Sequence, residues 1–139
     1  PKVFMSARNT NENMIFYYKN IISKYLSKKK KILYLGIAFK ENTNDLRNSK
    51  YFELMKILSK KYLMDIFDPV VEYERMNFRK KLIQKKPIYD VIILAVPHKM
   101  VLELLKNNIN SLLKKNGVFI DLNYNFKNID KKKYNYITL

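Results

Sequence analysis

Hydrophobic side chains follow two patterns along the chain, and these patterns distinguish the expected strands from the expected helices. Short, mostly apolar runs are typical of strands that are buried on both faces of a sheet. The expected strands are residues 32–39, 63–67, 90–96 and 117–122. Apolar residues three and four positions apart predict helices over residues 11–27, 50–62 and 99–115, and we expect a short helix within residues 70–88. The tail, residues 123–139, is polar with scattered aromatic residues, and no element is assigned to it.

Strands and helices alternate along the chain, which favours an α/β fold with a mainly parallel sheet and helices on both faces. The 139 residues suit one domain with a core of ordinary size. Ligands of such sheets bind at the carboxyl ends of the strands. The segments at these ends are AFKENTNDLRNS (residues 38–49), Asp68-Pro69, Pro97-His98 and Asp121-Leu122-Asn123.

The polar segment after the first expected strand is the strongest candidate for a ligand site. Lys40 is its first polar residue, and an ammonium group near the start of the next helix is well placed for a phosphate. Arg47 either adds a forked pair of donors or pairs with Asp45, and Thr43 offers a hydroxyl group. The alternative is an ordinary loop with an internal Asp45–Arg47 pair and with Ser49 capping the next helix. Spacing alone slightly favours this alternative.

Three further polar residues at expected strand ends have two interpretations each. For His98, a hydrogen-bonded residue at a strand end is favoured over a catalytic role. Asp68 and Asp121 are either turn residues or acids that meet a ribose. The sequence leaves these alternatives open.

Composition excludes several kinds of chemistry. The chain has no cysteine, which excludes disulfides, cysteine-ligated zinc and thiol nucleophiles. A single histidine cannot build a multi-histidine metal site. With only Gly36 and Gly117, neither a GxGxxG dinucleotide motif nor a Walker A loop is possible. We therefore expect no catalytic residue, no metal and no cofactor site in this chain.

The net charge of +16, from 28 basic and 12 acidic residues, favours anionic partners. A basic, non-enzymatic module that binds nucleic acid is therefore the main alternative function. However, the lysines are spread over the whole chain, and the run at 28–31 suits a solvated turn better than a membrane-binding patch. The aromatic residues mostly occupy core positions rather than alternating with basic residues on one surface. We expect neither a nucleic-acid nor a membrane partner.

The N-terminal segment, PKVFMSARNTNENM, has neither the apolar core nor the cleavage site of a signal peptide. No apolar run reaches the roughly 18–20 residues that a membrane span needs. A cytoplasmic location is therefore expected. The chain begins with Pro1 rather than Met, and we expect it to be part of a longer protein or a processed piece.

The segment GIAFKENTNDLRNSK resembles the motif that opens the C-terminal domain of nucleotide-sugar 6-dehydrogenases, roughly G-x-x-F-K-x-x-x-x-D-x-R-x-S. The matching residues are Gly36, Phe39, Lys40, Asp45, Arg47 and Ser49. Four other segments are similar to the family's in the same order: ARNTNENM (7–14, a turn that ends the connecting helix), IFDP (66–69), YDVIILAVPHKM (89–100) and GVFIDLN (117–123).

The resemblance implies a fold and a reaction. An N-terminal Rossmann domain binds NAD, helical elements dimerise, and a second, Rossmann-like domain holds the UDP part of a UDP-sugar. Residues 1–28 would be the end of the connecting helix and residues 29–139 the UDP-sugar-binding, Rossmann-like three-layer domain. The implied reaction is oxidation of the sugar C6 alcohol to a carboxylate, with a cysteine nucleophile and two NAD. This chain would be inactive alone, and the full-length enzyme would be a homo-oligomer.

The resemblance also assigns roles to residues. Lys40 would contact the UDP, Phe39 would line the pocket beside the uracil, and Arg8 would reach a substrate in the neighbouring subunit. The loop would be shaped by Asp45, Arg47 and Ser49. The family often has an arginine just after the last strand, where this chain has Asn123 and Tyr124. That difference favours the UDP-N-acetylhexosamine branch, which serves surface polysaccharide synthesis, over UDP-glucose.

Overall fold

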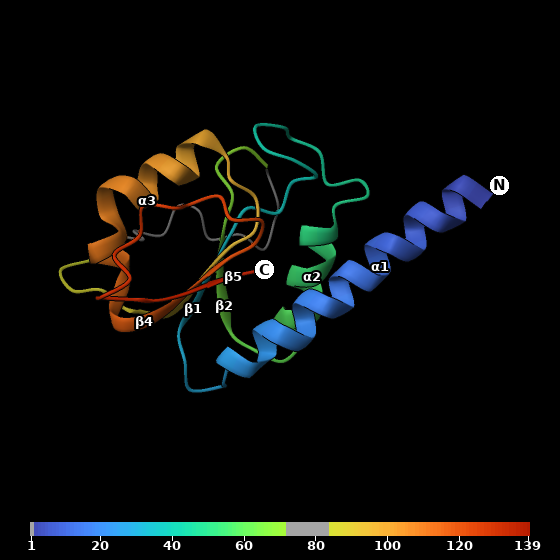
Figure 1. Cartoon of the computed structure of the whole chain (residues 1–139). Coiled ribbons are helices and arrows are strands. Elements are labelled where there is room, and N and C mark those ends of the chain that lie inside the picture. Colours follow the sequence, from blue (N-terminus) through green and yellow to red (C-terminus); the bar gives the residue numbers. More distant parts are fainter. Residues whose placement is uncertain (1, 72–83) are drawn as a thin grey trace.

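The computed structural model describes the backbone of residues 2–71 and 84–139, and the side chains from Thr10 onward within them (Figure 1). The helices are α1 (Lys2–Ile22), the 3-10 turn η1 (Ser23–Tyr25), α2 (Lys50–Ser59) and α3 (Lys99–Leu112). The strands are β1 (Ile32–Leu35), β2 (Met64–Phe67), β3 (Tyr89–Leu94), β4 (Leu113–Asp121) and β5 (Asn135–Thr138). None of the helices in this part of the chain is long and apolar enough to cross a membrane.

The strands form one sheet in the order β2-β1-β3-β4-β5, and all four pairings are parallel. Every residue of β1 is hydrophobic and buried, and β3 is hydrophobic and buried apart from the partly exposed Asp90 near its start, because both faces of these two strands are covered. The predicted α/β fold with a mainly parallel sheet is confirmed. All carboxyl ends of the strands therefore lie at one edge of the sheet.

Helices cover both faces of the sheet, as predicted. On one face, α1 and α2 pack through residues such as Tyr18, Ile22 and Leu54 against the side chains of Tyr34 and its neighbours in the sheet. On the other face, α3 packs against side chains that include those of Leu33, Ile92 and Phe119. Figure 1 shows α3 on the opposite side of the sheet from α1 and α2, with the N-terminal half of α1 extending beyond the domain.

Two expectations about the ends of the chain are wrong. Residues 135–138, left without an element, form the edge strand β5, which pairs with β4. The strand was missed because it is short and half exposed, so it carries no strong apolar pattern. Residues 7–14 are not a turn, because they lie within the continuous helix α1.

The other predicted elements exist, with shifted boundaries. The first strand ends at Leu35 rather than at residue 39, because Gly36 has a φ of +87° and turns the chain out of the sheet. The last predicted helix stops at Leu112, and β4 begins at Leu113. Most of the segment for which we expected a short helix, residues 72–83 of 70–88, lies outside the described residues.

Candidate functional site

The turn after β1 directs the polar segment to the carboxyl edge of the sheet. A Cβ atom on Gly36 would lie 2.5 Å from the backbone oxygen of Val96 and 2.7 Å from its nitrogen. The Gly36 N–H donates to the carbonyl oxygen of Phe67 at 2.9 Å. Only glycine suits this position, because the φ is positive and the neighbouring backbone leaves no room for a side chain. Residues 38–49, here called the strand-end loop, therefore begin between the ends of β2 and β3.

Bonds within the strand-end loop engage several of its polar groups. The Phe39 N–H donates to the carbonyl oxygen of Asp45 at 2.7 Å, and the Thr43 hydroxyl donates to the carbonyl oxygen of Lys40 at 2.9 Å. The Arg47 guanidinium donates to both carboxylate oxygens of Asp45, at 3.2 and 3.3 Å. The backbone N–H of Arg47 also donates to Asp45 Oδ1, at 2.9 Å. The side-chain hydrogen bonds from Arg47 hold the pKa of Asp45 below its usual value. Arg47 is thus engaged with its own loop.

Ser49 joins the end of the loop to its beginning. It is the N-cap of α2, and its hydroxyl oxygen accepts the N–H of Phe52 at 3.1 Å. The same hydroxyl lies 2.7 Å from the carbonyl oxygen of Ile37 and 3.0 Å from that of Ala38, to which it can donate its one proton. The residue is buried, with 2% of its surface exposed. Capping by serine thus sets the start of the helix and the closure of the loop together.

A buried carboxylate lies at the end of β2. Asp68 is 1% exposed, and its oxygens accept hydrogen bonds from four N–H groups. Oδ1 accepts those of Val70 and Val71, both at 2.9 Å, and Oδ2 accepts those of Ile37 at 2.8 Å and His98 Nε2 at 2.9 Å. Burial raises the pKa of Asp68, but these bonds outweigh it and the pKa lies below its usual value. Asp68 is therefore a turn residue with no oxygen left for a ribose.

His98 is fully buried and connects Asp68 to the strand-end loop. Its Nδ1 accepts the backbone N–H of Asn42 at 2.8 Å. The Asn42 side chain in turn accepts the N–H of Lys99, the first residue of α3, at 3.0 Å. Asn42 has a φ of 59°, a conformation that asparagine tolerates better than most residues. The hydrogen-bonded interpretation of His98 thus agrees with the structure.

Asp121, at the end of β4, is also a turn residue. Its Oδ1 accepts the N–H of Asn125 at 2.9 Å, and its Oδ2 accepts the N–H of Phe126 and the hydroxyl of Tyr136, both at 2.6 Å. The carboxylate is fully buried. Like Asp68, it is not available to a ribose.

Sequence reasoning missed the part played by the asparagines. Five non-glycine residues in the described ranges have positive φ, and four are asparagines: Asn42, Asn48, Asn116 and Asn123. In a chain with two glycines, asparagine is the usual substitute at such positions, so its distribution was a usable signal. Asn123, after β4, donates to the hydroxyl of Tyr51 at 2.6 Å and accepts from that of Tyr18 at 3.2 Å. It thereby ties α1 and α2 to the sheet.

Two predicted site residues remain open to a ligand. Phe39 is 49% exposed although it is a large apolar side chain. Lys40 is exposed and makes no ion pair with any residue that the structure describes. They are neighbours at the start of the strand-end loop. Arg8 lies in α1, but its side chain is outside the described part of the structure.

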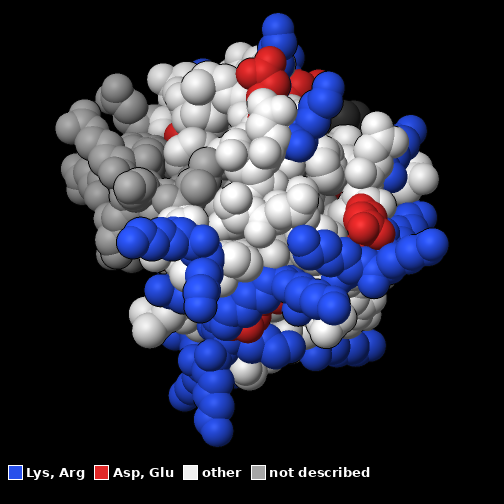
Figure 2. Space-filling model, turned by 90° about the vertical axis from the view of Figure 1, so that its left-hand side faces the viewer, with Lys and Arg blue, Asp and Glu red and all other residues white. Residues whose placement is uncertain are grey.

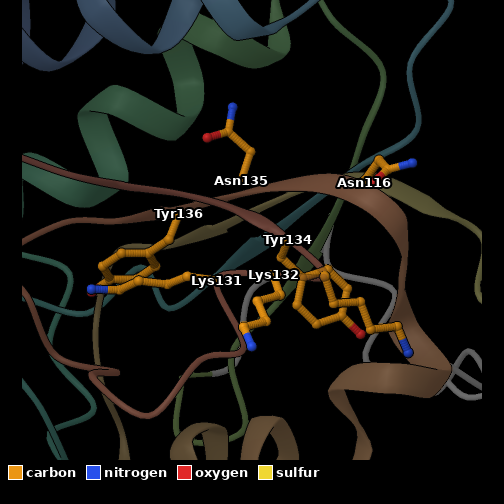
Figure 3. A pocket seen from close by; sticks show the side chains of 7 residues that line it. Asn116, Lys131, Lys132, Tyr134, Asn135 and Tyr136 are labelled. Atoms are coloured by element: carbon orange, nitrogen blue, oxygen red, sulfur yellow. The ribbon is translucent and has the colours of Figure 1, made fainter.

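A basic hollow lies elsewhere on the molecule (Figure 3). It measures about 410 Å³, and its lining residues are Asn116, Lys131, Lys132, Lys133, Tyr134, Asn135 and Tyr136. Asn135 is the first residue of β5 and pairs with Val118, so the hollow begins at the opposite end of this strand pair from Asp121. Figure 2 shows a face of the molecule on which lysines and arginines gather and acids are few. Among the described residues, no three His, Cys, Asp or Glu side chains could hold a metal ion.

Comparison with known proteins, by sequence and by structure, finds relatives that match nearly the whole of this chain. UDP-N-acetyl-D-glucosamine 6-dehydrogenase of Salmonella typhi is 33% identical over 135 residues, which cover 89% of this chain and 32% of that protein. Protein CapL of Staphylococcus aureus is 34% identical, covering 88% of this chain and 31% of that protein. The chain thus spans about a third of the length of these curated relatives. The structure of the UDP-N-acetyl-mannosamine dehydrogenase Cap5O from S. aureus superposes with a TM-score of 0.76 at 17% identity, covering 99% of this chain and 33% of that one.

The parallel sheet, the helices on both faces and the polar loop at the strand ends define a Rossmann-like α/β domain. The match to a family model makes the assignment more specific. The chain belongs to the UDP-glucose/GDP-mannose dehydrogenase family, and residues 33–128 match the family's UDP-binding domain. The matched residues include the whole strand-end loop.

Proposed function

We propose that this chain holds the UDP part of a nucleotide sugar at the strand-end loop, as the C-terminal domain of an NAD-dependent UDP-N-acetylhexosamine 6-dehydrogenase. One observation carries the proposal. The loop that matches the family's domain presents an exposed Lys40, which makes no ion pair with any described residue, beside a half-exposed Phe39, while its other cation, Arg47, is paired with Asp45. The loop thus offers a ligand one cation that is not in an ion pair and, next to it, one aromatic ring.

These two side chains suit the two halves of UDP. The Lys40 ammonium complements the charge of a diphosphate, and the Phe39 ring offers an apolar face to the uracil. The net charge of +16 raises the local concentration of an anionic ligand. Asp45, Arg47 and Ser49 act indirectly, because they hold the loop in shape. Arg8 is proposed to reach the substrate of a neighbouring subunit in a homo-oligomeric enzyme.

The reaction of the whole enzyme would be oxidation of the sugar C6 alcohol to a carboxylate. This chain contains no cysteine to act as the thiol nucleophile. Its residues do not fit a dinucleotide site either, because Gly117 and Gly36 are its only glycines and Gly36 is packed against Val96. A part of the protein beyond this chain would supply the nucleophile and bind NAD. Residues 1–28 would connect that part to the UDP-binding domain, residues 29–139.

We assign the sugar to the N-acetylhexosamine class. Two of the relatives described above carry a sugar in their names, and in both it is a UDP-N-acetylhexosamine. UDP-glucose is the alternative within the family. We also propose a role in surface polysaccharide synthesis in the cytoplasm, with neither nucleic acid nor membrane as a partner. Competition between UDP-N-acetylglucosamine and UDP-glucose as substrates of the longer protein would distinguish the two sugars.

Calorimetric titration with UDP, UDP-N-acetylglucosamine and NAD tests the proposal. We expect the chain to bind UDP and its sugar but not NAD, and Lys40→Ala to weaken UDP binding by about tenfold or more. Lys132→Ala is the matched control, because it removes an exposed lysine at the distant hollow and should leave UDP binding unchanged. Equal losses in both variants would indicate attraction by the net charge alone. Failure of both the chain and the longer protein to bind UDP would refute the proposal.

A further inference from the structure

The His98 ring connects a buried carboxylate to the strand-end loop. Its Nε2 faces Asp68 at 2.9 Å, and its Nδ1 faces the backbone N–H of Asn42 at 2.8 Å. We propose that His98, as a neutral imidazole with its proton on Nε2, is the positioning residue that holds Lys40 in place for the nucleotide. This inference rests on the proposed function, because it names the residue that orders the same site.

The two hydrogen-bond partners of the His98 ring determine which of its nitrogens carries the proton. The oxygen of Asp68 is an acceptor, so Nε2 must carry a hydrogen to bond with it. The backbone N–H of Asn42 can only donate, so Nδ1 must be without a hydrogen. The ring is therefore neutral, in one tautomer, with both nitrogens satisfied although the side chain is fully buried. The carboxylate selects this tautomer, since the other would place two acceptors against each other.

The bond to Asn42 acts on the ligand-binding end of the loop. Asn42 is two residues from Lys40 and is held at two points, its N–H by His98 and its side-chain oxygen by Lys99. The adjacent Thr43 hydroxyl bonds to the Lys40 carbonyl oxygen at 2.9 Å. The position of the Lys40 backbone is thus coupled through two short contacts to the ring of His98. Without the Nδ1 bond, Asn42 would keep one of its two anchors.

The two ring nitrogens have separable roles. The Nε2 bond completes the set of four donors around Asp68 and so contributes to stability. The Nδ1 bond reaches only the strand-end loop. Two substitutions divide these roles, because an asparagine amide oxygen occupies about the place of Nδ1 and a glutamine amide nitrogen about that of Nε2. His98→Asn keeps an acceptor for Asn42, and His98→Gln keeps a donor for Asp68.

The experiment compares both variants with the unsubstituted chain and with Lys40→Ala. UDP affinity is measured by calorimetry, thermal stability by circular dichroism, and exchange of the Asn42 amide proton by NMR. For His98→Gln we expect UDP affinity to fall by about five- to tenfold, as for one lost hydrogen bond, with faster exchange at Asn42. For His98→Asn we expect a lower melting temperature with UDP affinity within about twofold of the unsubstituted chain. The ¹⁵N spectrum of the unsubstituted chain should show the proton on Nε2.

The outcomes separate this inference from the proposed function. A chain that does not bind UDP at all would overturn the proposed function and the inference with it. UDP binding that depends on Lys40 but is unaffected by His98→Gln would overturn the inference alone. So would equal losses of affinity in His98→Gln and His98→Asn, which would indicate a role in stability only. If a variant does not fold, a proton found on Nδ1 of the unsubstituted chain would still overturn the inference.

Discussion

Replacing Asp68 by Asn changes the buried network at the strand ends with almost no change in shape. The carboxylate accepts from four N–H groups, two at each oxygen. An asparagine side chain offers one oxygen and one NH₂ group. In either orientation the NH₂ group faces two donors. If it faces His98 and Ile37, the ring can accept from it only by moving its own proton to Nδ1, which then opposes the N–H of Asn42.

The size of the effect follows from this count. Both orientations lose at least two hydrogen bonds. Hydrogen bonds to a charged group contribute about 1.5–3 kcal/mol each, and removing a buried charge offsets part of the loss. We expect Asp68→Asn to lower the free energy of unfolding by about 3–5 kcal/mol, which is typical when one member of a buried, hydrogen-bonded charged group is replaced. Small domains have a total of about 5–15 kcal/mol, so this loss would be a substantial share of the whole stability.

Urea unfolding at pH 7, followed by circular dichroism, measures this quantity. The control is Asp130→Asn, which makes the same chemical change at an exposed carboxylate. It should stay within about 0.5 kcal/mol of the unsubstituted chain. If Asp68→Asn costs no more than this control, the four-donor network does not stabilise the fold and the reasoning is refuted.

The pH dependence gives a second check. The folded-state pKa of Asp68 lies below its ordinary value, so its contribution is fully present above about pH 4–5 and is lost as the pH falls through the folded pKa. Below that pKa the protonated carboxyl resembles the asparagine amide. The stability difference between the unsubstituted chain and Asp68→Asn should therefore be constant near neutral pH and shrink in acid. A difference that grows in acid would contradict the assigned charge.

Three further substitutions have definite expected outcomes. An unfavourable positive φ alone costs about 1–3 kcal/mol. Gly36→Ala should lower the free energy of unfolding by more than this, because the new Cβ would also lie 2.5 Å from the Val96 oxygen, and urea unfolding measures the loss. Ser49→Ala should cost about 1–2 kcal/mol in the same assay, whereas Ser59→Ala at an exposed serine should cost little. Burial raises the pKa of Tyr18 to about 12, so its stabilising neutral form persists below about pH 10 and is lost as the pH rises toward 12. Tyr18→Phe should remove one ionisation near pH 12 from the ultraviolet difference titration, and an unchanged titration would contradict its burial.

Much of the fold was within reach of the sequence because its signals are local. Continuous apolar runs marked the strands, and their alternation with helices indicated a parallel sheet, which placed the strand-end loop at the carboxyl edge of the sheet. Pairs such as Asp45 with Arg47, two residues apart, are also short-range and could be considered in advance. The edge strand β5 could not be found in this way, because four half-exposed residues form a strand only when β4 is beside them.

The chain sequence by itself determined the α/β class, the strand-end loop with Lys40 and Phe39, and the absence of a thiol or a glycine-rich dinucleotide motif. Only the tertiary structure decided what the other polar residues at the strand ends do. Asn42 meets His98 across 56 positions, and Ile37 meets Asp68 across 31. Such contacts have no sequence period, since they exist only once the strands are aligned in one sheet. Folding therefore converts the acids at the strand ends into buried anchors of turns and leaves Lys40 exposed to a ligand.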